Sequence, residues 1–446
     1  MSHGALHIID SRTSQEYEIP IRENTVLATD LKQILASPLG EDRADQVGDG
    51  LRVNDPGLKN TCVTETNMTY TDGHRGLLLF RGYALEQLWQ SEFEDMLHLL
   101  VNGKYPTPSQ RESLRATLAV LMSTTPKDVA QVIEGFPPTS PPMPMIVAGL
   151  SAYLAHHADS IPACAGGNIY DPNPEYEDRA ILRTAAAYAV VMGMAASHSR
   201  GIAFTAATTD NTYFENLFIM MGLVECYTYR PDPVKLSCFR MFAALNSEHG
   251  MALSSFAMVV TASSLTDPIS GLISSLVAAY GPLHFGAPEA EYRTILAVGS
   301  PDQVPAFLKE HKSGKRRLFG YGHRTYTTID PRVKPIKDML LSELDRDSEP
   351  LVKVAREIDR LSPKDEYFKE RKLHANADFY GTFFFNRLGF QGEEIPVAMV
   401  AQRLVGILAH YRESMLKAND RLFRPTHNYT GETEPPLEMP APSAKL

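Results

Sequence analysis

Apolar residues recur every three to four positions through much of this chain, the spacing of a helix with one buried face. Two such stretches follow a serine with a glutamate three residues later, Ser91-x-x-Glu94 and Ser109-x-x-Glu112. In a capping box the serine oxygen accepts from a first-turn N–H and the glutamate reaches back. We therefore expect helices to open there, with these apolar faces: Phe93, Met96, Leu97 and Leu100 in the first, and Leu114, Leu118 and Leu121 in the second.

The same period predicts later helices and one apolar helix that is buried. The later helices fall at residues 251–264, 333–342, 351–360 and 397–415, and the alanine-rich stretch 184–197 is too short to span a membrane. Residues 5–21 alternate and carry a polar turn, which is typical of a β-hairpin. We find no internal repeat and no strand–helix alternation. The predicted class is mainly α with a short N-terminal hairpin.

Composition and charge narrow the possible partners. The 446 residues are 43% hydrophobic and 22% charged, which is ordinary for a soluble globular protein of two or more domains. A formal net charge of −10 disfavours nucleic acid as the main partner. The four cysteines show no CxxC spacing and are expected to be reduced thiols. The N-terminus has no secretory or transit pattern, so we expect no membrane partner.

Three histidines lie beside glycines, where the backbone can bring a ring close to a ligand. They are His249, before Gly250; His284, in the segment 281–287; and His323, after Gly322. Any one of them, taken singly, is more typical of a structural or surface histidine. Three with the same neighbours indicate a site.

Asp378 precedes a run of aromatic residues, namely Phe379, Tyr380, Phe383, Phe384 and Phe385. Apolar surroundings raise the pKa of a carboxylate and make it a better base near neutral pH. The alternative is an aspartate that caps a buried helix, which is the better interpretation of Asp378 by itself.

The segments GPLHFGA, GYGHR with DPR, NADFYG, AQRLVG and RPTHNYTG stand in one order along the chain, between residues 281 and 431. In this order and spacing they resemble the citrate synthase family, and the likeness extends back to residue 51. It implies an enzyme that condenses an acyl-CoA with oxaloacetate in a Claisen-type reaction. Hydrolysis of the thioester then gives CoA and a citrate or alkylcitrate.

The resemblance also implies a role for each matching residue. Asp378 matches the base that removes the α-proton, His284 the hydrogen-bond donor to the thioester oxygen, and His323 the donor to the oxaloacetate ketone. The matching oxaloacetate ligands are His249, Arg332, Arg403 and Arg424, the last reaching across a homodimer. Several guanidinium groups suit a dicarboxylate substrate. The chemistry implies no metal and no cofactor, since acyl-CoA is a substrate.

The implied fold is a citrate synthase-like dimer of two helical domains that close over the substrates. The expected parts are a hairpin and lead-in at 1–50, a large domain at 51–284 and 384–432, a small domain at 285–383, and a disordered tail at 433–446. The tail ends in Ala444-Lys445-Leu446, a close variant of the peroxisomal Ser-Lys-Leu signal. We therefore expect a peroxisomal protein, or otherwise a cytoplasmic one.

The chain departs from the common family pattern at several positions near these residues. Asn246 stands where many members have a histidine, and Glu248-His249-Gly250 replaces Asp-His-Glu. Phe285 and Pro288 replace the glycine and asparagine of Gly-Gly-Ala-Asn, and Thr327 replaces a frequent lysine. The basic residues expected to bind the CoA phosphates are Arg316, Arg317 and Arg324, although such a run is also typical of a solvated surface or a nuclear signal.

Phe285, Pro288 and the aromatic residues after Asp378 favour an acyl chain longer than acetyl, and so an alkylcitrate product. The alternatives are an ordinary citrate synthase that uses acetyl-CoA and a 2-methylcitrate synthase that uses propionyl-CoA. Two other classes stay open. One is a metal hydrolase built on His156, His157 and Asp159, although adjacent histidines on a helix point in different directions. The other is a non-catalytic member of the family.

Overall fold

The computed structural model describes residues 4–35, 50–161, 174–344, 350–417 and 422–431. The predicted disordered tail with its terminal tripeptide, and Cys164, lie outside the described residues. The chain divides into two compact units, Met1–Glu65 with Arg424–Leu446, and Thr66–Phe423. The expected boundaries between a large and a small domain, at residues 285 and 383, stay a prediction.

The first unit contains the predicted hairpin. Strands β1 (Gly4–Asp10) and β2 (Gln15–Ile21) pair antiparallel, with Gly4 opposite Ile21 and Asp10 opposite Gln15. Asp10 stabilises the turn, because its carboxylate accepts from the backbone and guanidinium of Arg12. A short 3-10 helix, η1 (Ala28–Gln33), follows.

The second unit begins with a small antiparallel sheet that the pattern of the sequence does not predict. Its strands are β3 (Thr69–Asp72), β4 (Leu77–Phe80) and β5 (Tyr83–Ala84), in the order β3-β4-β5. Strands this short give too few alternating positions to stand out from turns. The sheet contributes to the candidate site, because the hydroxyl of Thr69 donates to the buried carboxylate of Glu248.

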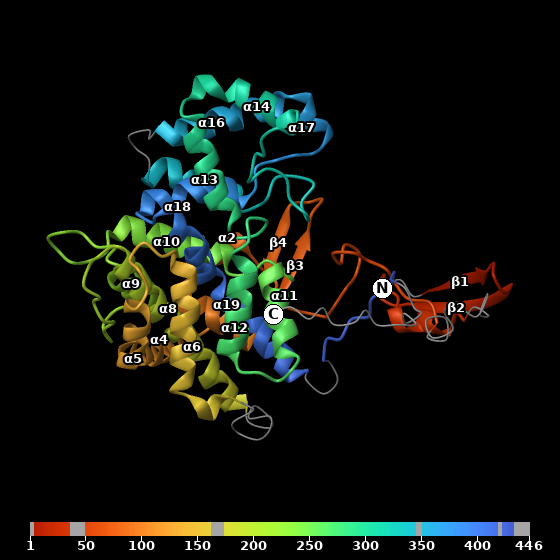
Figure 1. Cartoon of the computed structure of the whole chain (residues 1–446), viewed down its shortest axis with the longest axis horizontal. Helices are drawn as coiled ribbons and strands as arrows, with labels where there is room; N and C mark the ends of the chain where they lie inside the picture. The colour runs from red at the N-terminus through yellow and green to blue at the C-terminus, as the bar shows by residue number, and fades with distance from the viewer. Residues whose placement is uncertain (1–3, 36–49, 162–173, 345–349, 418–421, 432–446) are drawn as a thin grey trace, which may run out of the picture. The chain divides into compact units, whose positions relative to one another are not determined.

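Helices make up most of the second unit (Figure 1). The first group is α2 (Leu85–Leu88), α3 (Phe93–Asn102), α4 (Pro108–Ser123), α5 (Lys127–Glu134), α6 (Pro142–Ala155), η3 (Ala158–Ser160) and α8 (Pro174–Ser199). The second group is α9 (Tyr213–Met220), α10 (Pro233–Asn246), α11 (Leu253–Ala262), α12 (Pro268–Ala279) and α13 (Ala287–Val298). The third is η4 (Pro301–Gln303), α14 (Val304–Lys312), α15 (Val333–Met339), the π-helical turn η5 (Leu340–Leu344), α16 (Pro350–Leu361), η6 (Ser362–Lys364), α17 (Glu366–Glu370), α18 (Ala377–Leu388), η7 (Gly392–Glu394) and α19 (Ile395–Leu416).

Both predicted helices with capping boxes form, but their caps lie elsewhere. Helix α4 is capped by Thr107, whose hydroxyl accepts from the N–H of Gln110, because Pro108 fills the first helical position. Helix α3 begins at Phe93, and Asp95 accepts from the N–H of Glu92. The hydroxyl of Ser91 is bonded to Tyr105 instead, so the predicted serine caps were wrong by one or two residues.

Helix α19 is the centre of the core. Every residue from Ile395 to Tyr411 is buried, and the helix packs against α3, α8, α10, α11, α12 and α13. In Figure 1 it runs through the middle of the unit, with α14, α16 and α17 at one end and α4, α5 and α6 towards the other. Its buried polar residues include Gln402, Arg403 and His410, which contact Asn246, Asn246 and Glu248, respectively.

Helix α8 is the one described helix that is long and apolar enough to cross a membrane by composition. Of the apolar segment of α8 that meets this criterion, 89% is buried inside the protein. Tyr188 illustrates the packing, since it is fully buried and its hydroxyl donates to the carbonyl of Val397 in α19. The prediction of a buried helix over residues 184–197 is confirmed.

Candidate active site

Two buried guanidinium groups share one acceptor at the base of the site. Asn246, the last residue of α10, accepts through Oδ1 from Nη1 of Arg332 at 2.9 Å and from Nη2 of Arg403 at 3.1 Å. Arg403 also donates through Nε to the carbonyl of Asn246. Arg332 lies just before α15 and forms a bidentate pair with Asp330, at 3.0 and 2.7 Å. The structure thus brings both predicted oxaloacetate arginines together.

A buried carboxylate supports the turn that carries His249. Glu248 is fully buried, and its Oε1 accepts from Thr69 at 3.1 Å and from the backbone of Gly250. The same oxygen lies 3.2 Å from Nε2 of His410 in α19. Burial acts to raise the pKa of Glu248, but His410 and Arg403 hold it below its usual value. The turn is therefore fixed to both the sheet and α19.

His249 and His323 lie against each other and share Tyr326 as a neighbour. Their ring centroids are 5.1 Å apart, and Nε2 of His249 is 3.1 Å from the Tyr326 hydroxyl. Nδ1 of His323 accepts from the backbone N–H of Thr325 at 3.0 Å and of Tyr326 at 3.3 Å. In a neutral imidazole the other nitrogen then carries the proton. Nε2–H of His323 is therefore a donor, as its predicted role requires.

His284 lies in the turn before α13 and has the opposite tautomer to His323. Its Nε2 lies 2.9 Å from the Ser254 hydroxyl and 3.4 Å from the Ser254 backbone N–H. Because a backbone N–H can only donate, Nε2 accepts and Nδ1 carries the proton. The turn requires glycine at 286, since a Cβ there would lie 2.7 Å from the carbonyl oxygen of Tyr280.

Asp378 lies in the first turn of α18 and is not its cap. Asn376 is the cap: its Oδ1 accepts from the N–H of Asp378 at 2.9 Å, and its Nδ2 donates to the carbonyl of Gly322 at 2.8 Å. One side chain thus joins the loop of His323 to the helix of Asp378. Close approach also requires Gly320, with φ +70°, where a Cβ would lie 2.7 Å from Cα of Phe379.

The arginine pair influences the protonation of the other predicted site residues. Burial raises the pKa of Asp378 to about 6, although Arg332 and Arg403 act to lower it. Burial lowers the pKa of His284 to about 4, with Arg403 acting in the same direction. The pKa of His323 is also lowered to about 4, by burial and by Arg332. Near neutral pH both histidines are uncharged donors, and Asp378 is an ionised base.

Phe285 packs against two of these groups. It is 4% exposed, its ring centroid is 4.2 Å from that of His284, and the guanidinium carbon of Arg403 lies 5.6 Å from its centre. An aromatic face in this range stabilises a cation. Phe285 therefore packs against residues of the site and does not present its ring to an open substrate channel.

The aromatic residues after Asp378 belong to the core. Phe379, Tyr380, Phe383, Phe384 and Phe385 are each 1% exposed or less. Phe384 packs edge-on against Phe242 of α10 at 4.9 Å between centroids. They fill the core and are not available to line a channel for an acyl chain.

The remaining predicted residues take no part in the hydrogen bonds given above for the described residues of the site. Arg316 pairs with Glu310 at 3.4 Å and lies over the ring of Phe307, while Arg317 and Arg324 are exposed. The assignment of these three to CoA stays a prediction. Arg424 is exposed in the first unit, and is not among the residues that the second unit brings together.

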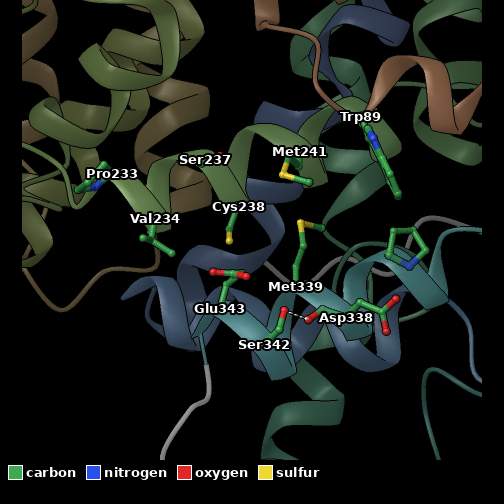
Figure 2. Close-up of a pocket in the computed structure, with 11 residues that line it drawn as sticks. Trp89, Pro233, Val234, Ser237, Cys238, Met241, Asp338, Met339, Ser342 and Glu343 are labelled. Atoms are coloured by element: carbon green, nitrogen blue, oxygen red, sulfur yellow. Dashed lines mark hydrogen bonds between the residues drawn. The ribbon is translucent and has the colours of Figure 1, made fainter.

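A groove of about 470 Å³ lies elsewhere, between α10 and α15 with η5. Figure 2 shows Met241 and Cys238 of α10 facing Met339 and Glu343, with Trp89 at one end. Met241 lies five residues before Asn246, which is about 140° around a helix, so the groove follows another face of α10. None of the predicted site residues lines it. Burial raises the pKa of the Cys238 thiol to about 11, so this thiol is protonated at neutral pH.

Among the described residues, no three His, Cys, Asp or Glu side chains are grouped so that they could hold a metal ion. His156 lies 3.4 Å from Asp128, and the ring of His157 packs beside Tyr153. The described part of the chain gives the metal hydrolase alternative no support.

The sequence pattern did not single out several residues that support the site, among them Ser254, Tyr326 and Asn376. Asn376 carried a usable signal, since an asparagine two residues before an acidic helix start is a frequent cap. Ser254 and Tyr326 carried none, because each meets its histidine only through the tertiary fold.

The fold and site together define a class of protein. A desolvated carboxylate base, two neutral imidazole donors and two buried guanidinium groups suit enolisation of a weak carbon acid beside an anionic substrate. Residues 57–426 match the family model described as citrate synthase, C-terminal domain. The chain belongs to the citrate synthase family.

Relatives and solved structures agree with this membership. The chain is 49% identical to alkylcitrate synthase phiJ of a fungal species, over 97% of this chain and 95% of the relative. It is 44% identical to alkylcitrate synthase tstJ of Talaromyces stipitatus, over the same shares. The crystal structure of citrate synthase from Pyrobaculum aerophilum superposes with a TM-score of 0.78 at 26% identity, covering 86% of this chain and 94% of that one.

We predict that kcat/KM has one acid limb near pH 6. Asp378 must be ionised to accept a proton and its pKa in the substrate-free protein is about 6, so kcat/KM falls tenfold per unit of pH below that value. The two histidines stay neutral there because their pKa values are about 4. The measurement is kcat/KM for the acyl-CoA from pH 4.5 to 8. A profile that stays flat down to pH 5 would contradict the raised pKa of Asp378.

Replacing Asp378 by asparagine is expected to abolish activity and to stabilise the fold. We expect kcat to fall by roughly two orders of magnitude or more, because the amide cannot accept the proton. Because the folded pKa lies above the usual value, the ionised carboxylate destabilises the fold above pH 6, by about 3 kcal/mol. Asp378→Asn removes that cost, so Tm at pH 7.5 should rise.

The matched control for this variant is Asp302→Asn at an exposed position, which should change neither quantity. Oxaloacetate binding to the Asp378→Asn protein should survive when measured by calorimetry. Near-normal turnover would refute Asp378 as the base.

Proposed function

We propose that this chain is an alkylcitrate synthase, which condenses an acyl-CoA longer than acetyl-CoA with oxaloacetate. The observation that carries the proposal is the complete set of base, donors and arginine pair gathered in one unit. The names of the two fungal relatives support the longer acyl chain. The aromatic residues after Asp378 lie in the core, and Phe285 packs against His284 and Arg403, so the two relatives are the support for the longer acyl chain.

The proposed reaction begins with enolisation. Asp378 removes the α-proton of the thioester, and Nδ1–H of His284 donates to the thioester oxygen as it gains charge. A carboxylate with a pKa of about 6 is too weak a base to do this unless an aimed donor stabilises the enol. The Ser254 contact holds the His284 proton on the required nitrogen.

The α-carbon of the enol then attacks the ketone carbon of oxaloacetate. Nε2–H of His323 donates to the ketone oxygen, which becomes the hydroxyl of the product. Arg332 and Arg403 bind carboxylates of oxaloacetate through the N–H groups that do not donate to Asp330 or Asn246. Water then cleaves the thioester, which releases CoA and the alkylcitrate.

The acyl chain is tested with acetyl-CoA through decanoyl-CoA, assayed with oxaloacetate by thiol release. We expect kcat/KM for hexanoyl-CoA to exceed that for acetyl-CoA, since four buried methylenes contribute up to about 3 kcal/mol. A preference for acetyl-CoA would identify an ordinary citrate synthase, and one for propionyl-CoA a 2-methylcitrate synthase. No thiol release with any of them would indicate a non-catalytic member.

Phe285→Leu is a companion variant for this panel, because Phe285 packs against His284. It should change the ratio between hexanoyl-CoA and acetyl-CoA. The control is Phe390→Leu, a phenylalanine that is 2% exposed and packs on Phe239 and Phe385. That variant should leave the ratio as it is.

We propose further that the active form is a homodimer in which Arg424 completes the partner's site. The antiparallel pair of helices α11 and α12 exposes apolar side chains that a partner would cover: Leu253 at 57%, Val277 at 59%, and Leu283, just after α12, at 78%. An exposed apolar patch of this kind is typical of an interface between subunits.

Mixed dimers test the role of Arg424. Arg424→Ala and Asp378→Ala homodimers should both be inactive, and their equimolar mixture should recover about a quarter of wild-type activity if subunits exchange at random. Mixing Asp378→Ala with His284→Ala is the control, because both changes affect groups of the same subunit, and it should recover nothing. Failure of the first mixture, with mixed dimers shown to form, would place Arg424 in cis or outside the site.

We propose a peroxisomal location from the terminal Ala444-Lys445-Leu446. A fluorescent protein fused ahead of an exposed tail should be punctate and colocalise with a peroxisomal marker. Deleting Leu446 should make it diffuse. A diffuse pattern for the intact tail would remove the location without affecting the chemistry.

A further inference from the structure

The neighbours of Asn246 fix the orientation of its carboxamide. Its Nδ2 donates to Oε1 of Gln402 at 3.2 Å, and its Oδ1 accepts from Arg332 and Arg403. An arginine has five N–H donors and no acceptor, so only the oxygen of the amide can face the pair. Asn246 is 2% exposed, so water does not compete for these bonds.

The hydrogen bonds of the two arginines show what this arrangement leaves for a substrate. Among the described residues, Arg332 uses three of its five N–H groups, two on Asp330 and one on Asn246. Arg403 uses two, both on Asn246. Each guanidinium keeps at least two donors, the number that a bidentate carboxylate contact needs.

The charge of the acceptor matters as much as its position. Asp330 already neutralises Arg332 by a bidentate pair, and Glu248 acts on Arg403 while it also engages His410. A neutral amide holds both cations in register and adds no further negative charge. A carboxylate at this point would lie within hydrogen-bond distance of both guanidinium groups and compete with the substrate.

We infer that Asn246 is a positioning residue for oxaloacetate, which acts by giving Arg332 and Arg403 one shared and uncharged acceptor. It sets the spacing of the pair and preserves their positive charge for the carboxylates of the substrate. The inference rests on the proposed use of oxaloacetate and names the group that tunes its binding.

Two variants separate the acceptor from its charge. Asn246→Asp keeps an acceptor and adds a negative charge, and Asn246→Leu removes the acceptor and adds no charge. For both we expect the calorimetric Kd for oxaloacetate to rise on the order of 30-fold, since a hydrogen bond to a charged group is lost or a competing charge is gained. KM for the preferred acyl-CoA at saturating oxaloacetate should stay within about threefold of wild type.

The pH profile supplies a measurement that a general loss of packing would not change. In Asn246→Asp the new negative charge should move the acid limb of kcat/KM to higher pH, because a nearby like charge raises the pKa of Asp378. In Asn246→Leu the limb should not move upward. The control is Asn386→Asp, because the amide of Asn386 in α18 contacts the hydroxyl of Tyr292 in α13. This variant should have the wild-type Kd for oxaloacetate and the wild-type position of the acid limb.

The outcomes distinguish this inference from the proposed function. An active wild-type enzyme whose Asn246→Asp and Asn246→Leu variants bind oxaloacetate within about threefold of wild type would overturn the inference alone. Absence of any thiol release by wild type with oxaloacetate would overturn the proposed function. Should Asn246→Leu fail to fold, Asn246→Asp decides the question, because it is nearly isosteric and keeps the acceptor.

Discussion

Burial of two guanidinium groups beside each other is the constraint on which the rest of this site depends. Arg332 and Arg403 are 5% and 3% exposed, so like charges are held together away from water. Such an arrangement is stable only when every neighbouring acceptor is well placed. Asp330, Glu248 and Asn246 are those acceptors or counter-charges, and they come from two separate stretches of the chain, 246–248 and 330.

The electrostatic consequences reach the groups that are proposed to carry the chemistry. The pair acts with burial to keep His284 and His323 neutral, so each can donate from the nitrogen that its backbone contacts leave protonated. The same pair moderates the rise in the pKa of Asp378, which burial moves to about 6. Burial and the charge of the arginine pair together therefore leave Asp378 ionised and the two histidines uncharged at neutral pH.

Three of the departures of this chain from the common family pattern, Asn246, Glu248 and Phe285, act on Arg403. Asn246 bonds to it, Phe285 lies against its guanidinium face, and Glu248 acts on its charge. Three substituted positions that meet one cation form a connected set, and changes within such a set are expected to be non-additive. This is the part of the site in which substrate preference within the family could be tuned without altering the base or the donors.

The sequence by itself determined the class, the helices with strong apolar periodicity, the hairpin and the family. Those properties depend on local spacing and on motifs that are contiguous in the chain. Only the tertiary structure decided that Asn376 caps the helix of Asp378, that Ser254 fixes the tautomer of His284, and that Phe285 is packed against Arg403. It also decided that the phenylalanines after Asp378 fill the core, because an apolar run has the same pattern whether it faces a ligand or another helix. Which groups share an acceptor is set by the packing of α10, α15 and α19, and no periodicity in the sequence encodes it.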